Sequence, residues 1–124
     1  RRTLESRIAD LESVTFHHEL GSLWDKTDRL VELAGHLARL LGEDADNCQR
    51  AAQLCKADLV TDMVGEFPDL QGVMGRYYAI HDGEKKVIGR AIEEHYHPRH
   101  AGDALPQSKV GRILAVADRI DSLV

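Results

Sequence analysis

A carboxylate inside an apolar segment is the first feature of this sequence that could support chemistry. If the helix predicted to begin near Asp44 continues through Asp58, that carboxylate shares one face with Ala51, Cys55 and Leu59. A buried carboxylate is costly unless a metal ion, a cation or several hydrogen-bond donors compensate its lost hydration. The sequence therefore predicts a partner of one of these three kinds for Asp58.

Histidines and a second aspartate make a metal ion one candidate for that partner. The chain has seven histidines, of which His95, His97 and His100 lie close together but with loose spacing, and Asp118 occupies another predicted core position. Isolated histidines of this kind are more often structural than metal-binding. The sequence has no GxSxG, Walker, HExxH or CxxC motif, so none of these patterns indicates a nucleophile.

The composition is that of an ordinary globular protein. The 124 residues fit one domain, with 43% hydrophobic and 30% charged residues and a net charge of -5. There is no global basic signature for nucleic acid, although 16 lysines and arginines allow a local basic face. Cys48 and Cys55 lie two helical turns apart, too far for a disulfide, and are expected to be free buried thiols.

The chain has no apolar run of membrane length and no visible signal peptide, so no membrane association is predicted. It begins without Met and closes on an apolar helix, which we interpret as a domain cut from a longer polypeptide.

Hydrophobic periodicity predicts helices throughout the chain. The first spans 3–20, and the second runs from Ser22 or Asp25 to Leu41, with Gly42 as its stop. The core side of the second helix is predicted to carry Leu30, Leu33, Ala34, Leu37, Leu40 and Leu41. The third covers 44–64, where Gly65-Glu66-Phe67-Pro68 ends it.

The remaining chain follows the same pattern. Asp69 is expected to cap a fourth helix whose inner positions are Leu70, Val73, Met74, Tyr77 and Tyr78. A fifth helix carries Val87, Ile88, Ala91 and Ile92, and residues 97–109 form an irregular loop. The last helix begins near Ser108 and buries Val110, Ile113, Leu114, Ala117 and Ile120, with Asp118 and Asp121 at the edge of that stripe. No strand pattern or repeat is visible, so the predicted fold is all-α.

The order of these elements resembles an HD domain, a helical fold in which a His, a His-Asp pair and a later Asp bind a metal for phosphohydrolysis. Asp58 matches the Asp of the pair, Ala57 replaces its His, and Asp118 matches the final Asp. By helix register the first His falls at or beside Lys26. The resemblance implies a single HD-like bundle of about six helices from which two of the four ligands are missing.

Longer runs are similar to the HD-like region of the bacterial glycyl-tRNA synthetase β subunit. They are LGSLWDKTDRL, KADLVTDMVGEFPDLQGVMGRYYAIHDGE, EEHYHPRHAGDALP and AVADRIDSLV. This resemblance implies a cytoplasmic assembly of α and β subunits, usually α2β2, in which the α subunit activates glycine with ATP and the β subunit recognises and positions tRNA(Gly). Residues 1–124 would then be one module of a larger β subunit, without catalytic residues or a cofactor of its own.

Two alternatives remain open beside this tRNA-binding and scaffolding module. One is a surviving metal-dependent HD phosphohydrolase, which the missing imidazoles at positions 26 and 57 disfavour because nitrogen ligands supply most of the metal affinity. The other is a purely structural spacer domain, which measurements of tRNA affinity with and without the domain would separate from the first interpretation.

Two sets of residues are predicted to have a role, one in an internal salt bridge and the other in contact with RNA. A side-chain cation, Lys26 first and Arg29 second, is expected to replace the metal as an internal salt bridge to Asp58 or Asp118. Any contact with RNA is expected to use cations of the fourth and fifth helices and the following loop: Arg76, Lys85, Lys86, Arg90 and Arg99. Lys86 and Arg90 lie one helical turn apart and could address adjacent phosphates.

Overall fold

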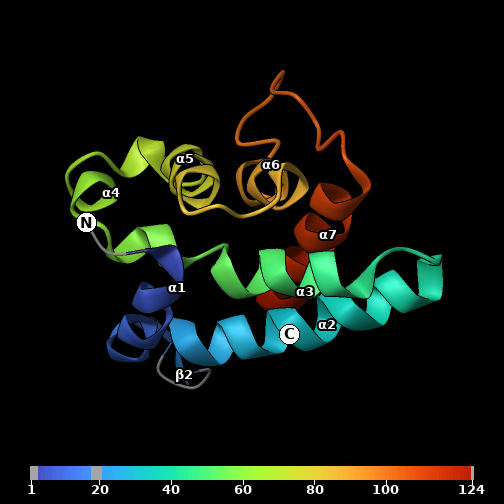
Figure 1. Cartoon of the computed structure of the whole chain (residues 1–124), viewed down its shortest axis with the longest axis horizontal. Coiled ribbons are helices and arrows are strands. Elements are labelled where there is room, and N and C mark those ends of the chain that lie inside the picture. Colours follow the sequence, from blue (N-terminus) through green and yellow to red (C-terminus); the bar gives the residue numbers. More distant parts are fainter. Residues whose placement is uncertain (1–2, 18–20, 124) are drawn as a thin grey trace.

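The computed structural model describes residues 3–17 and 21–123, and it confirms an all-α protein. The α-helices are α1 (Leu4–Arg7), α2 (Leu23–Leu41), α3 (Ala45–Leu54), α4 (Asp62–Glu66), α5 (Val73–His81), α6 (Lys86–Glu94) and α7 (Lys109–Leu123). Three 3-10 turns lie between them: η1 (Ile8–Ser13), η2 (Ala57–Val60) and η3 (Pro68–Leu70). Figure 1 shows α5 and α6 side by side above α2 and α3, with α7 crossing both layers.

The first predicted helix is wrong beyond its first turns. After α1 and η1, the strands β1 (Thr15–His17) and β2 (Gly21–Ser22) pair antiparallel. Leu4 and Leu11 are still buried, because the apolar spacing suits a turn of α-helix followed by 3-10 helix. Residues 18–20, the end of the predicted helix, lie outside the described residues.

Helix α2 has the predicted start and stop. Ser22 caps it through a capping box with Asp25, in which each side chain accepts a hydrogen bond from the other residue's backbone N–H. At its end Gly42 has a φ of 70°, a left-handed conformation that costs glycine little. The predicted burial of Leu40 and Leu41 is wrong, since they are 69% and 64% exposed on the last turn of α2, which projects past α7 (Figure 1).

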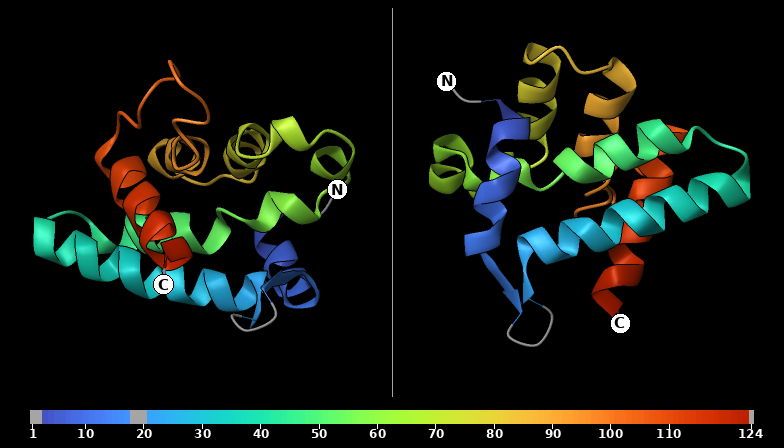
Figure 2. Two further views of the ribbon diagram at one scale, coloured as in Figure 1. Left: turned by 180° about the vertical axis from the view of Figure 1, so that it is seen from behind. Right: turned by 60° about the horizontal axis from the view of Figure 1, so that its bottom comes forward.

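The core lies where α2, α3, α6 and α7 meet. Its fully buried members include Leu30, Ala34, Ala51, Leu54, Ile92 and Leu114. Small residues predominate on α2 and α3, which lets these two helices pack closely along their length, as both views in Figure 2 show. Cys48 and Cys55 belong to this core as free thiols. Burial raises the pKa of the Cys55 thiol to about 12.

The third predicted helix is broken into α3, η2 and α4. The α3 helix ends at Leu54, and Thr61 then caps α4 by accepting a hydrogen bond from the Val64 N–H. The break carries Asp58 out of the α3 register, so this carboxylate does not share a continuous helical face with Ala51. The side chain of Asp58 is directed instead to the start of α5.

The fourth helix starts later than predicted, and the face that it buries also differs from the prediction. Pro68–Leu70 is a 3-10 turn, and α5 begins at Val73 with Gly75 and Ala79 on its buried side. Val73 and Tyr77, predicted to be buried, are 43% and 61% exposed. The inner positions must be small, because a Cβ on Gly75 would lie 2.8 Å from Ile92 Cγ2. On α7, Ile120 is likewise 37% exposed, whereas Asp121 is buried.

Candidate functional site

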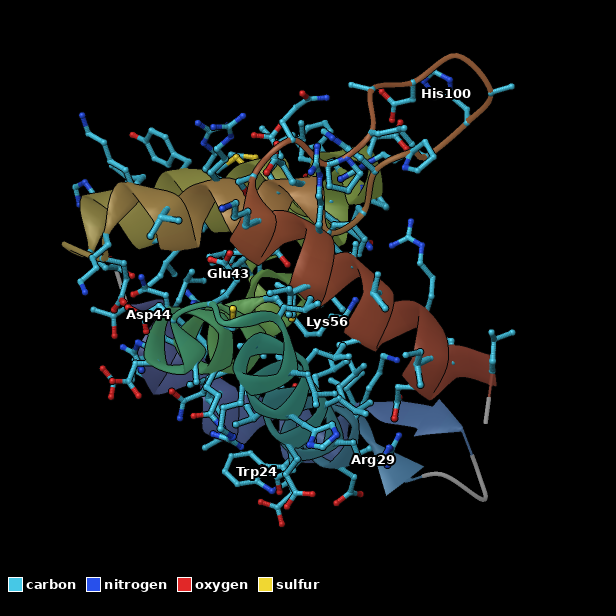
Figure 3. The ribbon with its side chains drawn as sticks, turned by 90° about the vertical axis from the view of Figure 1, so that its right-hand side faces the viewer. Trp24, Arg29, Glu43, Asp44, Lys56 and His100 are labelled. Atoms are coloured by element: carbon cyan, nitrogen blue, oxygen red, sulfur yellow. The ribbon has the colours of Figure 1, made fainter. Side chains whose placement is uncertain are left out.

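Four charged side chains from distant parts of the chain meet between α2, α3 and α7; three are buried, and Asp118 is partly buried with its side chain 15% exposed. We call Lys26, Lys56, Asp118 and Asp121 the buried charged cluster. Lys26 Nζ lies 3.2 Å from Asp118 Oδ1 and 2.9 Å from Asp121 Oδ2. Lys56 Nζ lies 3.4 Å from Asp118 Oδ1. Both lysines are at most 5% exposed, and Figure 3 shows Lys56 in the interior beside α7.

Helical spacing explains how two helices can each contribute a pair of charges. Asp118 and Asp121 lie three residues apart on α7, and Lys26 and Arg29 have the same spacing on α2, so each pair shares one face. Arg29 Nε lies 2.6 Å from Asp121 Oδ1 at the more exposed edge of the contact. Each carboxylate is thereby contacted by two cations of the chain.

The electrostatic balance favours ionised carboxylates in this cluster. Burial by itself would raise the pKa of Asp118, but the nearby charges, Lys56 foremost, hold that pKa below its ordinary value. The pKa of Asp121 is also lowered, because the hydrogen bonds from Arg29 and Lys26 outweigh its burial. The lysines therefore supply the positive charge that a bound metal would otherwise supply to such carboxylates.

A neutral histidine completes the surroundings of Lys56. Burial, assisted by the charge of Lys56, holds the pKa of His95 well below its usual range. His95 Nδ1 contacts the Ile92 carbonyl, which can only accept, so Nδ1 carries the proton and Nε2 is free to accept. Lys56 Nζ donates to that Nε2 at 3.1 Å and lies 4.4 Å from the centre of the Tyr96 ring.

Asp58 is partnered by backbone rather than by a lysine. Its Oδ2 accepts hydrogen bonds from Gly72 N at 2.6 Å and from Gly75 N at 3.1 Å, the first amides of α5, where no side chain of the helix provides a cap. A carboxylate is favourable there because the unpaired N–H groups at a helix start carry partial positive charge. Of the two carboxylates predicted to pair with Lys26 or Arg29, Asp58 has no such salt bridge, because it caps α5 instead.

The predicted contact between Lys26 and Asp118 fits the geometry, although the contribution of this salt bridge to stability stays a prediction. Lys26 and Asp118 are brought together, whereas the aspartate that contacts Arg29 is Asp121. Ala57, which stands where the HD pair would have its His, is fully buried. Residues 3–17 and 21–123 hold no group of three or more His, Cys, Asp or Glu side chains that could bind a metal. His100, one of the loosely spaced histidines, lies at the far end of the loop before α7 (Figure 3).

Sequence reasoning missed Lys56, Asp121 and His95 as members of this site. A signal existed for Lys56, since it is the one cation in the apolar segment around Asp58. A second signal was the equal three-residue spacing of the two cations on α2 and the two carboxylates on α7. The pairing itself spans up to 95 residues of sequence, so no local pattern could identify it.

The predicted RNA-facing cations are in very different situations. Arg76 Nη1 lies 2.9 Å from Glu93 Oε1, and Arg90 Nε lies 3.3 Å from Glu94 Oε2. Arg99 donates to the backbone carbonyls of Asp69 and Gln71 and so holds its loop against η3. These three arginines therefore already have partners within the fold.

Lys85 and Lys86 remain more available. Lys85 Nζ has a 3.4 Å contact with Asn47 Oδ1, and Lys86 is exposed with no hydrogen bond or ion pair to another described residue. Both stand at the start of α6. The structure thus places two unneutralised cations on this surface.

Comparison with known proteins assigns a family to the whole chain. The family model described as "Glycyl-tRNA synthetase beta subunit" matches residues 1–124. The chain is 53% identical over 124 residues to the glycine–tRNA ligase beta subunit of Neisseria gonorrhoeae. It is 52% identical to the beta subunits of Janthinobacterium sp. and Polaromonas naphthalenivorans. All of this chain is covered in each case, but only 18% of each relative. Among the described residues, no helix is long and apolar enough to cross a membrane.

Proposed function

Because the chain belongs to the glycyl-tRNA synthetase β subunit family, we propose that it is a non-catalytic, HD-like module of such a subunit. In this proposal the module helps to bind and position tRNA(Gly) in a cytoplasmic assembly. That assembly also contains the α subunit and the remaining β-subunit domains, and it attaches glycine to tRNA with ATP.

The contact between Lys26 and Asp118 supports the HD-like, non-catalytic part of the proposal. In the resemblance to an HD domain, the first metal ligand falls at or beside Lys26 and the last at Asp118, and the side chains of these two residues meet at 3.2 Å. A lysine ammonium donates hydrogen bonds but has no lone pair for a metal. With Lys26 and Lys56 both against Asp118, the chain itself neutralises the charge of the carboxylate, and phosphohydrolysis through a metal at this position is disfavoured.

The observation that carries the tRNA-binding part is the exposed cation pair Lys85 and Lys86 at the start of α6. Cations without an ion-pair partner in the fold can neutralise phosphates and release their counterions, which supplies most of the sequence-independent affinity for nucleic acid. Arg76, Arg90 and Arg99 contribute less in this proposal because each has a partner in the fold.

The experiment reverses both charges, Lys85→Glu with Lys86→Glu, in the complete α/β assembly. We expect a weaker affinity for tRNA(Gly), and a plot of log Kd against log salt whose slope falls by about one for each lost phosphate contact. Lys109→Glu serves for comparison: it is a single reversal at the start of α7, at a 76% exposed lysine whose Nζ lies 3.4 Å from Glu43 Oε1. An unchanged affinity and slope would contradict tRNA binding by this surface and favour a structural spacer. One tightly bound metal per chain, together with phosphodiester hydrolysis, would favour the phosphohydrolase.

A further inference from the structure

The outer face of α5 is apolar where a surface helix is normally polar. Val73, Tyr77 and Ile80 lie at i, i+4 and i+7 and are 43%, 61% and 40% exposed. Ile80 reaches Gly89 at the edge of α6, which lies beside α5 (Figure 1), but no other part of the described chain covers the exposed surface of Val73 and Tyr77. The stripe is therefore available to a partner.

A hollow of about 490 Å3 opens beside this stripe, between α5 and α6. Its apolar wall is the stripe itself, and its rim carries His81 and the ion pair of Arg76 with Glu93. Gly89 lets the two helices approach here, because a Cβ at this position would lie 2.9 Å from Ile80 Cδ1. The hollow is thus built by the packing of the two helices and by a glycine that keeps their contact close.

Two aromatic rings give the hollow a flat side. The Tyr77 and His81 rings are parallel to within 8°, with their centres 6.4 Å apart, and both residues are exposed. Flat rings with accessible faces stack on nucleobases of any identity. An aliphatic protein side chain would gain nothing from this parallel arrangement beyond apolar contact.

The polar rim also matches a base. The Arg76 guanidinium offers N–H donors and the Glu93 carboxylate offers an acceptor 2.9 Å away, so donor and acceptor stand together as they do along the edge of an unpaired base. Along α6, Glu93 shares a face with Arg90 and Lys86, at i, i−3 and i−7. The exposed cation Lys86 therefore lies two turns along α6 from the rim. In this position it would attract the phosphate backbone of a strand bound at the hollow.

We propose that the hollow between α5 and α6 binds an unstacked base of the RNA, with Tyr77 as its stacking surface and the Arg76–Glu93 pair facing its edge. This inference rests on the proposed function and specifies how the module would contact RNA: by one splayed-out base as well as by phosphates. Stacking on an aromatic side chain accounts for the affinity of single-stranded RNA without a sequence requirement.

The test replaces Tyr77 by Leu and by Phe in the complete α/β assembly and measures the Kd for tRNA(Gly). Leu keeps an apolar side chain but has no flat ring, so Tyr77→Leu is expected to raise the Kd about tenfold. Tyr77→Phe keeps the ring and is expected to retain most of the affinity. If the two variants bind tRNA(Gly) equally well, stacking on Tyr77 is excluded.

A second measurement identifies the occupant directly. A photoreactive p-benzoylphenylalanine placed at position 77 is expected to cross-link to tRNA(Gly) in the assembled enzyme. Cross-linking only to another polypeptide would overturn the proposal and indicate a protein-filled hollow. If the Lys85 and Lys86 reversals weaken tRNA binding but Tyr77→Leu does not, the tRNA-binding function stands and the base-binding hollow is wrong. If neither change affects binding, both are wrong.

Discussion

The charges of the buried charged cluster are shielded from water, whereas the charges on the outer surface of α5 and α6 are exposed to it. In the cluster, Lys26 and Lys56 are at most 5% exposed and meet carboxylates of the same chain. On the surface, Lys86 is exposed and lacks such a partner among the described residues. A buried charge has lost its hydration and depends on its internal partner, whereas an exposed charge is hydrated in both the folded and unfolded states.

Because of this difference, substitutions in the two regions are expected to affect different properties: stability in the cluster and binding on the surface. Substitution in the cluster is expected to change the free energy of unfolding, because a carboxylate loses its compensating charge inside the protein. Substitution on the α5–α6 surface is expected to change RNA affinity while leaving the free energy of unfolding within about 0.5 kcal/mol. The predictions below test that separation, beginning with the largest effect.

Lys26→Met should lower the free energy of unfolding of the 124-residue chain by about 3 kcal/mol, measured by urea denaturation. The loss stays at the lower end of the range for buried pairs, because Lys56 still contacts Asp118 and Arg29 still contacts Asp121. Lys86→Met is the matched surface control and should unfold like the parent. Adding Asp118→Asn to Lys26→Met should increase the loss, because it leaves the buried Lys56 without its carboxylate. Equal unfolding of Lys26→Met and the control would contradict the distinction between the two regions.

Asp58→Ala should cost about 2 kcal/mol, because the buried N–H groups of Gly72 and Gly75 lose their acceptor. Asp58→Asn keeps an acceptor oxygen of the same size and should cost clearly less. Urea midpoints of the two variants provide the measurement. If Asn is as destabilising as Ala, the charge of Asp58 rather than its role as a cap for α5 is what stabilises the fold.

Acid should destabilise the chain through His95. Its pKa is about 6.5 in the unfolded chain and well below that when folded, since burial disfavours the imidazolium. As pH falls below 6.5, the unfolded state binds a proton that the folded state does not, so stability falls by up to about 1.4 kcal/mol per pH unit. Urea denaturation between pH 7 and pH 5 should show this slope, and His95→Gln should flatten it. A parent profile as flat as that of His95→Gln would show that His95 does not titrate in this way.

The comparison also explains why two predicted inner positions of α5, Val73 and Tyr77, are exposed. Periodicity places Val73 and Tyr77 on one face, and hydrophobicity alone assigns such a face to the core. The folded chain instead turns Gly75 and Ala79 inward, because Ile92 and Asp58 leave no space for a Cβ at Gly75. Steric fit between distant residues therefore overrides the local pattern.

The sequence by itself determined the helical class, the limits of α2 and the start of α7 to within a few residues, and the family to which the chain belongs. These depend on local information: the 3.6-residue period, the Ser22 capping box, the glycine at Gly42 and long matching runs. It also indicated that Asp58 needs a partner, because a carboxylate in an apolar segment has to be compensated wherever the chain folds.

Only the tertiary structure decided which partner that is. Backbone amides at the start of α5 bond Asp58 Oδ2, Lys26 joins Asp118 and Asp121 across more than 90 residues, and Lys56 lies against His95. A cation and a donor amide compensate a carboxylate equally well in principle, so residue types alone leave the choice open. The choice is made by the packing of α2, α5 and α7, which determines the group that reaches each carboxylate within hydrogen-bond distance.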